Sequence, residues 1–222
     1  MRLNKYLAHA TGISRREADL VIEAGRVTIN GRVAKLGVQV AKEHDLVEID
    51  GHPVEEGVYR YLLLNKPDGY LSSRKAQSAP TLYDLLPEKY HSLKTVGRLD
   101  KDTSGIILLT DDGDFAHQLT HPKFQKEKKY LVRLDKYLTE KGMEKLSRGI
   151  GLEDGISRLQ VSPAKDGQYL ISMSEGRNRQ IRRTFEAAGY QVTALHRIRF
   201  GPYSESDLSG SMYAEVNKRT RA

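Results

Sequence analysis

The sequence predicts a two-domain α+β protein, in which a small basic domain precedes a larger domain organised around a buried strand. The chain has 222 residues, of which 38% are apolar, and this length supports one full core plus a small satellite domain. Helical spacing followed by a hairpin signal marks residues 1–55 as the small domain. In the second domain, the continuous apolar run of residues 106–109 is typical of a strand buried on both faces of a sheet.

Composition and charge narrow the classes of function. The net charge of +7 and the sequence pI near 9.4 favour a polyanionic partner such as a nucleic acid. The sequence contains no cysteine, which excludes disulfides, thiolate nucleophiles and zinc sites with cysteine ligands. No run is long and apolar enough to span a bilayer, and residues 1–16 lack the apolar centre of a signal peptide. We therefore expect a cytoplasmic protein that does not contact membranes.

Local signals define the elements of residues 1–55. A helix with apolar residues at helical spacing is expected from Leu3 and is broken by Gly12. Ser14 and Glu17 form a capping-box pattern that predicts the start of a second helix. Asn30-Gly31, between alternating residues, is a strong hairpin signal. Residues 53–57 are acidic and lack periodicity, so we interpret them as a flexible linker to a second domain of residues 58–222.

The motifs S-R-R-E-A-D (14–19), I-E-x-G-R-V (22–27) and N-G (30–31) occur in that order. This segment resembles the αL RNA-binding domain first described in ribosomal protein S-four. The resemblance implies binding of structured RNA through phosphates and shape; a small basic domain with another partner is the alternative. The RNA-binding residues that we expect are Arg2, Lys5, Ser14, Arg15, Arg16, Arg26, Asn30, Arg32 and Lys35.

The candidate catalytic loop is residues 97–105, with the sequence Gly-Arg-Leu-Asp-Lys-Asp-Thr-Ser-Gly. It places two carboxylates, a guanidinium and two hydroxyls before the buried strand. By residue types alone, a polar turn with local caps is an equally good interpretation. The stretch resembles the signature G-R-L-D-x-D-T-S/T-G of the RsuA/RluB-type ribosomal RNA pseudouridine synthases. In that family the first aspartate is catalytic, which implies that role for Asp100; we expect Asp102 to order the loop.

Three further motifs match the same family in order. They are Asn-Lys-Pro-x-Gly at residues 65–69, a basic turn that leads into a strand at residues 126–133, and a third motif at residues 175–183 with a Q-I-R element. The resemblance implies that Tyr130 lies against the target base, that Ile181 packs beside it, and that Arg182 pairs with Asp100. The other substrate-binding residues that we expect are Arg98, Arg177, Asn178, Arg179 and Arg183.

The basic residues around this third motif carry a physical requirement of their own. Arginines at a helix start are unfavourable beside the positive end of the helix dipole, so an anion must offset them. RNA phosphate and a buried aspartate are both candidates. Residues 196–201 alternate basic and apolar side chains, which predicts a half-buried strand with one cationic face.

The resemblance implies a catalytic domain with a mixed, mainly antiparallel sheet and flanking helices. It also implies isomerisation of uridine to pseudouridine in ribosomal RNA by an aspartate, without a cofactor or a metal. The motif variants favour 23S over 16S ribosomal RNA as the partner, and we expect a monomer. Two rivals remain open: a non-catalytic ribosome-assembly factor on the same fold, and a metal-dependent nuclease that uses the carboxylates between Asp100 and Asp114.

Overall fold

The computed structural model describes residues 1–41, 43–55, 57–75 and 79–220. The chain divides into two compact units, Met1–Tyr59 and Arg60–Ala222. Each unit has its own cluster of buried apolar side chains.

Two helices pack on a small antiparallel sheet in the first unit. The helices are α1 (Leu3–Thr11) and α2 (Arg15–Glu23), and the sheet, in the order β2-β1-β3-β4, consists of β1 (Val27–Ile29), β2 (Arg32–Val33), β3 (Val47–Ile49) and β4 (His52–Pro53). The predicted capping box is present, because the Ser14 hydroxyl accepts from the Glu17 amide and the Glu17 carboxylate accepts from the Ser14 amide. Leu7, Ile22 and Val27 are at most 2% exposed and belong to the core of this unit.

The start of the predicted linker belongs to the first unit instead. Pro53 pairs with Glu48 in the β3–β4 ladder, the Val54 amide donates to the Val47 carbonyl, and the Val54 carbonyl accepts from the Tyr6 hydroxyl at 2.6 Å. The linker interpretation is therefore wrong for Pro53 and Val54, because these backbone groups are paired in the unit. Glu56, in the same predicted linker, lies outside the described residues.

Within the described residues, the second unit is built on a nine-stranded mixed sheet. Its main path runs β11-β12-β8-β13-β7-β5-β15, with β14 paired to β13 and β6 paired to β7. Its strands are β5 (Tyr61–Lys66), β6 (Lys94–Thr95), β7 (Ser104–Thr110), β8 (Lys128–Leu134), β11 (Gln160–Pro163), β12 (Tyr169–Met173), β13 (Val192–Phe200), β14 (Tyr203–Ser204) and β15 (Tyr213–Glu215). All neighbours are antiparallel except β7 and β13, so the expected mixed, mainly antiparallel sheet is confirmed.

The parallel contact between β7 and β13 depends on a glycine. Gly105 pairs with Arg197, and a Cβ atom on Gly105 would lie 2.3 Å from the Arg197 carbonyl oxygen. Gly105 also has φ +108°, which a residue with a side chain rarely adopts. The last residue of the candidate signature is thus required for the strand to join the sheet.

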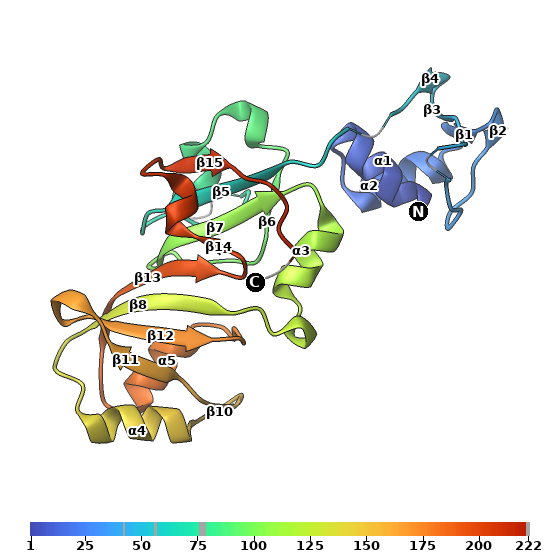
Figure 1. Ribbon diagram of the computed structural model, residues 1–222. Helices are drawn as coiled ribbons and strands as arrows, with labels where there is room; N and C mark the ends of the chain where they lie inside the picture. Colours follow the sequence, from blue (N-terminus) through green and yellow to red (C-terminus); the bar gives the residue numbers. More distant parts are fainter. Residues whose placement is uncertain (42, 56, 76–78, 221–222) are drawn as a thin grey trace. The chain divides into compact units, whose positions relative to one another are not determined.

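Helices and a small hairpin flank this sheet. The helices are α3 (Gly113–Thr120), α4 (Glu140–Arg148) and α5 (Gln180–Ala187), and the hairpin is formed by β9 (Ile150–Leu152) and β10 (Gly155–Ser157). Short 3-10 turns occur at η1 (Leu82–Leu85), η2 (Glu88–Tyr90), η3 (Pro122–Phe124), η4 (Lys165–Gly167) and η5 (Glu205–Leu208). Figure 1 shows α4 and α5 together with β11 and β12 at the lower end of the sheet.

Buried side chains hold α5 against the strands. Ile181 and Phe185 on α5 belong to the same apolar cluster as Tyr130 and Val132 on β8, and Phe185 is fully buried. Burying such side chains stabilises the fold by about 1.5–3 kcal/mol each. The helix is thereby fixed over the region that holds the candidate catalytic residues. Among the described helices, none has the length and apolar character needed to cross a bilayer.

Candidate active site

The loop of residues 97–105 is anchored on both sides by backbone contacts. It leads into β7, in which the six residues from Gly105 to Thr110 are buried. The Ser72 hydroxyl donates to the Leu99 carbonyl at 2.8 Å and accepts from the Leu99 amide at 3.1 Å. The Gly69 amide donates to the Lys101 carbonyl at 2.7 Å. The segment after β5 and the candidate catalytic loop therefore support each other, and Asp100 sits on a fixed backbone.

Lys66, in the Asn-Lys-Pro-x-Gly motif, is fully buried. Its Nζ donates to the carbonyls of Pro67 at 2.8 Å and Tyr70 at 2.9 Å, so it shapes the turn after β5. Burial lowers the pKa of Lys66 to about 8, and the charges of nearby aspartates, Asp100 among them, oppose this shift.

A pocket of about 250 Å³ brings the candidate catalytic groups together. Asp100, Tyr130, Ile181 and Arg182 all line it, and Tyr130 and Ile181 are 8% and 5% exposed. The other expected residues on its wall are Arg98, Arg177, Asn178 and Arg179. Arg183 does not line it. The sequence motifs thus meet in one cavity, although they are spread over 85 positions from Arg98 to Arg182.

Several residues of this wall carried no signal in the family motifs. They are Thr120 on α3, Met173 on β12, and Leu195, Arg197 and Phe200 on β13. Leu195, Arg197 and Phe200 were within reach of sequence reasoning, because they lie on a strand with alternating side chains. Nothing in the sequence indicated which of its faces would border the pocket.

The ion pair of Arg182 differs from the expected one. Its Nε lies 3.2 Å from Oδ2 of Asp102, and among the described residues no ion pair joins Arg182 to Asp100. Asp102 also accepts a bidentate pair from Arg179, at 3.0 and 2.9 Å, and this pair holds the pKa of Asp102 below its usual value. The prediction of an Asp100–Arg182 pair is wrong in this structure, because the second aspartate of the loop occupies both arginines.

The Asp100 carboxylate makes no hydrogen bond or ion pair within the described part of the chain. The charge of Asp100 nevertheless raises the pKa of both Arg179 and Arg182, which places those cations within electrostatic range. Burial is the larger influence on Arg182 and lowers its pKa. Asp100 thus lines the pocket with its oxygens available and with two cations nearby.

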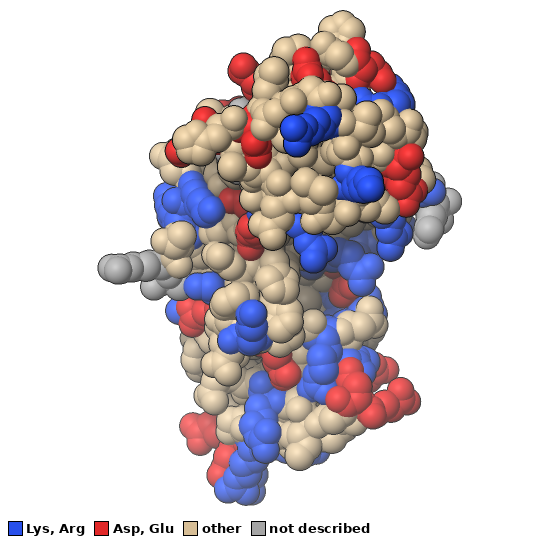
Figure 2. Space-filling model, turned by 90° about the vertical axis from the view of Figure 1, so that its right-hand side faces the viewer, with Lys and Arg blue, Asp and Glu red and all other residues tan. Residues whose placement is uncertain are grey.

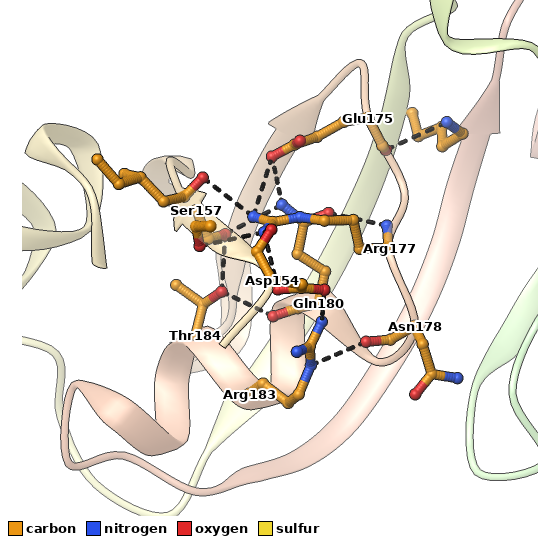
Figure 3. Close-up of polar contacts among 11 residues, drawn as sticks. Asp154, Ser157, Glu175, Arg177, Asn178, Gln180, Arg183 and Thr184 are labelled. Carbon is orange, nitrogen blue, oxygen red and sulfur yellow. Dashed lines mark hydrogen bonds and ion pairs between the residues drawn. The ribbon is translucent and has the colours of Figure 1, made fainter. Parts of the chain in front are cut away.

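The arginine segment, residues 177–183, is also held by a second aspartate, which pairs with Arg177 and Arg183 (Figure 3). Asp154, in the turn between β9 and β10, accepts from Arg177 Nη1 at 2.8 Å and from Arg183 Nη2 at 2.7 Å. Gln180 continues the network, since its side-chain amide donates to Ser157 Oγ at 3.0 Å and its oxygen accepts from the Arg177 amide. The anions that offset the arginines at the start of α5 are therefore Asp102 and Asp154. Neither is buried: their side chains are 45% and 41% exposed.

The backbone at this helix start is unusual. Arg179 precedes α5 with φ +46°, a left-handed conformation that residues with side chains adopt at an energetic cost. Such outliers cluster at functional sites, where the surrounding contacts hold them. Here the bidentate pair with Asp102 is the contact that does so.

The expected RNA-binding residues of the first unit fall into two groups. Ser14 caps α2, Arg26 pairs with Asp50, and Asn30 bonds to Asp45 and the Leu46 amide, so these three have structural partners. The exposed cations are Arg2, Arg15, Arg16, Arg32 and Lys35, and Lys5 is half-buried. Figure 2 shows Lys and Arg side chains spread over the face that it draws, with acidic side chains between them.

Among the described residues, no group of three or more His, Asp or Glu side chains is arranged to hold a metal ion. Asp112, one of the carboxylates of the nuclease alternative, is 3% exposed and caps α3 by accepting from the Phe115 amide at 3.0 Å. It also accepts from the Tyr61 hydroxyl and Lys218 Nζ, at 2.8 Å each. Capping and core contacts account for this carboxylate.

Comparisons with known proteins agree with both motif sets. The family described as RNA pseudouridylate synthase matches residues 60–187, and the S4 domain family matches residues 1–47. Ribosomal large subunit pseudouridine synthase B of Pseudomonas aeruginosa is 39% identical over 98% of this chain, and the chain spans 60% of that relative's length. An uncharacterized RNA pseudouridine synthase of Aquifex aeolicus is 36% identical over 98% of this chain and 91% of its own length. A crystal structure of a pseudouridylate synthase superposes with a TM-score of 0.67 and 32% identity, over 98% of this chain and 96% of the other.

Proposed function

This chain belongs to the RNA pseudouridylate synthase family and carries an S4 domain, and on that premise we propose that it isomerises uridine to pseudouridine in ribosomal RNA, with Asp100 as the catalytic residue. The observation that carries the proposal is the convergence of Asp100, Tyr130 and Arg182 on one pocket. A module that only bound RNA would gain nothing from an unpaired carboxylate facing a polyanion.

The reaction needs only positioned side chains. The C1′–N1 bond of uridine breaks, a C1′–C5 bond forms, the C5 proton is removed, and N1 gains a proton, so atoms and charge balance without a cofactor. Asp100 can attack the sugar or the base, or it can stabilise a glycal-like intermediate while Tyr130 or another base moves the proton. In each route Arg179 and Arg182 favour the ionised carboxylate electrostatically.

The target nucleotide must leave its stack to reach the pocket. Extruding a base costs about a few kcal/mol, which contacts to the protein offset. Tyr130 and Ile181 offer flat apolar contact for the base, and exposed cations such as Arg98 offer contacts to phosphate. The cations of the S4 domain would add affinity for structured RNA.

We infer 23S ribosomal RNA as the substrate class. The support is the P. aeruginosa relative, which is named for the large ribosomal subunit. The rival function is a ribosome-assembly factor that binds the same RNA without chemistry.

The deciding experiment maps pseudouridine in ribosomal RNA from cells with and without this protein, and then repeats the reaction with purified protein and a 23S transcript. One position should lose its pseudouridine in the deletion strain and regain it in vitro. Asp100→Asn should abolish the reaction and leave RNA affinity within about tenfold, because the amide keeps the shape and loses the charge. Asp166→Asn is the matched control, since Asp166 is exposed and its left-handed backbone suits Asn.

An unchanged modification pattern in the deletion strain, together with RNA binding by the purified protein, would favour the assembly factor. A near wild-type rate for Asp100→Asn would remove Asp100 from the chemistry.

A further inference from the structure

Arg197 is a buried cation that the proposed mechanism does not use. It lies on β13, is 3% exposed, and lines the same pocket as Asp100. Its Nε donates to the Ile106 carbonyl at 2.9 Å, and its guanidinium stacks over the Phe200 ring at 4.6 Å. Of the five N–H groups that an arginine carries, only this one has a protein acceptor among the described residues, and Nη2 is buried without any.

The surroundings make this burial costly. Among the described residues, no carboxylate forms an ion pair with Arg197. Two lysines lie within electrostatic range. Burial and the positive charge of Arg197 lower the pKa of Lys128 on β8, although the charge of Glu175 opposes this shift, and Arg197 also contributes to lowering the pKa of Lys66. Lys128 Nζ donates to the carbonyls of Glu175 at 3.2 Å and Ser174 at 3.4 Å, which leaves one of its three N–H groups without a partner. A buried, unpaired Arg197 beside the half-buried cation of Lys128 is unfavourable in the free protein, so this wall suits a group that brings acceptor oxygens.

The remaining walls limit what that group can be. Tyr130, Met173, Ile181, Leu195 and Phe200 surround the pocket with flat or apolar surface. A flipped nucleotide enters such a pocket with its base, while its charged phosphates stay near solvent. A side chain as buried as Arg197 therefore meets the base. A uracil ring presents two carbonyl oxygens, whereas cytosine replaces the C4 carbonyl with an amino donor.

On the premise of the proposed function, we infer that Arg197, with Lys128 beside it, binds the C4 carbonyl oxygen of the target uracil, rejects cytosine at that position, and stabilises the negative charge that develops on the ring. That charge arises in every route open to Asp100. If the C1′–N1 bond breaks, its electron pair goes to N1 and spreads to O2 and O4. If Asp100 adds to C6, the C5–C6 π electrons move toward C5 and O4. The C1′–C5 bond then forms, and protonation of N1 balances the loss of the C5 proton, which leaves the ring neutral.

The test compares Arg197→Met and Arg197→Lys with the control Arg133→Met, which removes the same charge from an exposed position on β8. Single-turnover rates at saturating 23S transcript, RNA affinity at several salt concentrations, and thermal midpoints are measured for each. For Arg197→Met we expect a rate loss of about 100-fold to 1,000-fold, as when one donor to a developing oxyanion is removed. The salt slope of binding should stay unchanged, because no phosphate contact is lost. Arg197→Lys should retain part of the rate, since it keeps a donor and loses the planar fork.

Two readouts separate this role from a structural one. Removing a buried, unpaired charge should leave the thermal midpoint of Arg197→Met equal or higher, whereas a structural arginine would lower it. A transcript with cytidine at the mapped position should bind wild-type protein more weakly than the uridine transcript, and Arg197→Met should bind both equally.

The outcomes also separate this inference from the proposed function. If wild-type protein forms no pseudouridine, the proposed function fails. If wild-type protein is active and Arg197→Met keeps its rate, only the Arg197 inference fails. If Arg197→Met reaches the wild-type rate once RNA saturates it, and its slope of log affinity against log salt is reduced by about 0.7, Arg197 instead contacts a phosphate.

Discussion

Asp102→Asn tests whether the loop aspartate holds the arginine segment in place. The carboxylate accepts two hydrogen bonds from Arg179, at 3.0 and 2.9 Å, and its Oδ2 lies 3.2 Å from Arg182 Nε. Asparagine keeps the shape of the side chain but removes the charge and one acceptor. Arg182, whose side chain is 13% exposed, is then left without its counterion.

The size of the effect lies between two limits. Breaking a fully buried pair costs about 3–5 kcal/mol, whereas an exposed pair contributes about 0.2–1 kcal/mol. Asp102 is 45% exposed, so solvent screens its interactions and the loss should be about 2 kcal/mol. For a protein of this size, that lowers the thermal midpoint by about 4–8 °C.

The loss should also depend on pH. The hydrogen bonds from Arg179 hold the pKa of Asp102 below its usual value, so the folded state binds the proton less tightly than the unfolded state. The stabilisation is present in full above the unfolded pKa of about 4, and it is lost as pH falls through the folded pKa. The difference in free energy of unfolding between wild type and Asp102→Asn should shrink below about pH 4.

The assay is urea unfolding of both proteins, followed by fluorescence or circular dichroism, at neutral pH and below pH 4. Asp166→Asn is again the control, because it removes one negative charge from an exposed turn with a left-handed backbone. If Asp102→Asn destabilises the protein no more than Asp166→Asn does, or if its effect is the same at every pH, the ion pairs of Asp102 do not stabilise this segment.

Three further predictions follow from other groups. Burial lowers the pKa of Lys66 from 10.5 to about 8, so the unfolded state binds more protons than the folded state between these pH values. As pH increases through this range, the free energy of unfolding of wild type should rise by about 3 kcal/mol relative to that of Lys66→Met. Parallel curves of unfolding free energy against pH for the two proteins would contradict this prediction. Asp154→Asn should loosen the start of α5 and lower the single-turnover rate by roughly tenfold, because the pocket wall is misplaced. Limited proteolysis after Arg177 measures the loosening, and a cleavage rate equal to that of wild type would show that the segment stays fixed. Replacing Arg15 and Arg16 with Gln should reduce the slope of log affinity against log salt by about 0.7–0.9 per lost phosphate contact, and an unchanged slope would remove both from the RNA interface.

Local signals in the sequence predicted the two helices of the first unit and the central strand correctly. Ser14 and Glu17 form their capping box with groups three residues apart, so no distant contact can override them. The apolar run of residues 106–109 is buried within β7, as a strand in the middle of a sheet requires. Residues 82–85 form the 3-10 turn η1, because four residues cannot stabilise an α-helix by themselves.

The β9–β10 hairpin had no comparable signal. Its strands are three residues each, too short for alternation to be read. Asp154 lies in its turn, 23 positions before Arg177, and only the tertiary fold brings the two together. The sequence therefore predicted that anions offset the arginines, but it did not identify Asp102 and Asp154 as those anions.

The β13 strand shows how one irregularity redirects a side chain. Strict alternation would place Arg197 and Arg199 on one cationic face, as we expected for a half-buried strand. The pairing of β13 with β8 shifts register between these residues, and such bulges next to active sites re-aim side chains. Arg197 is therefore 3% exposed on the pocket wall, while Arg199 is only half-buried and does not line the pocket. A one-residue change in register, which pattern reading cannot detect, thus decides which arginine can meet the base.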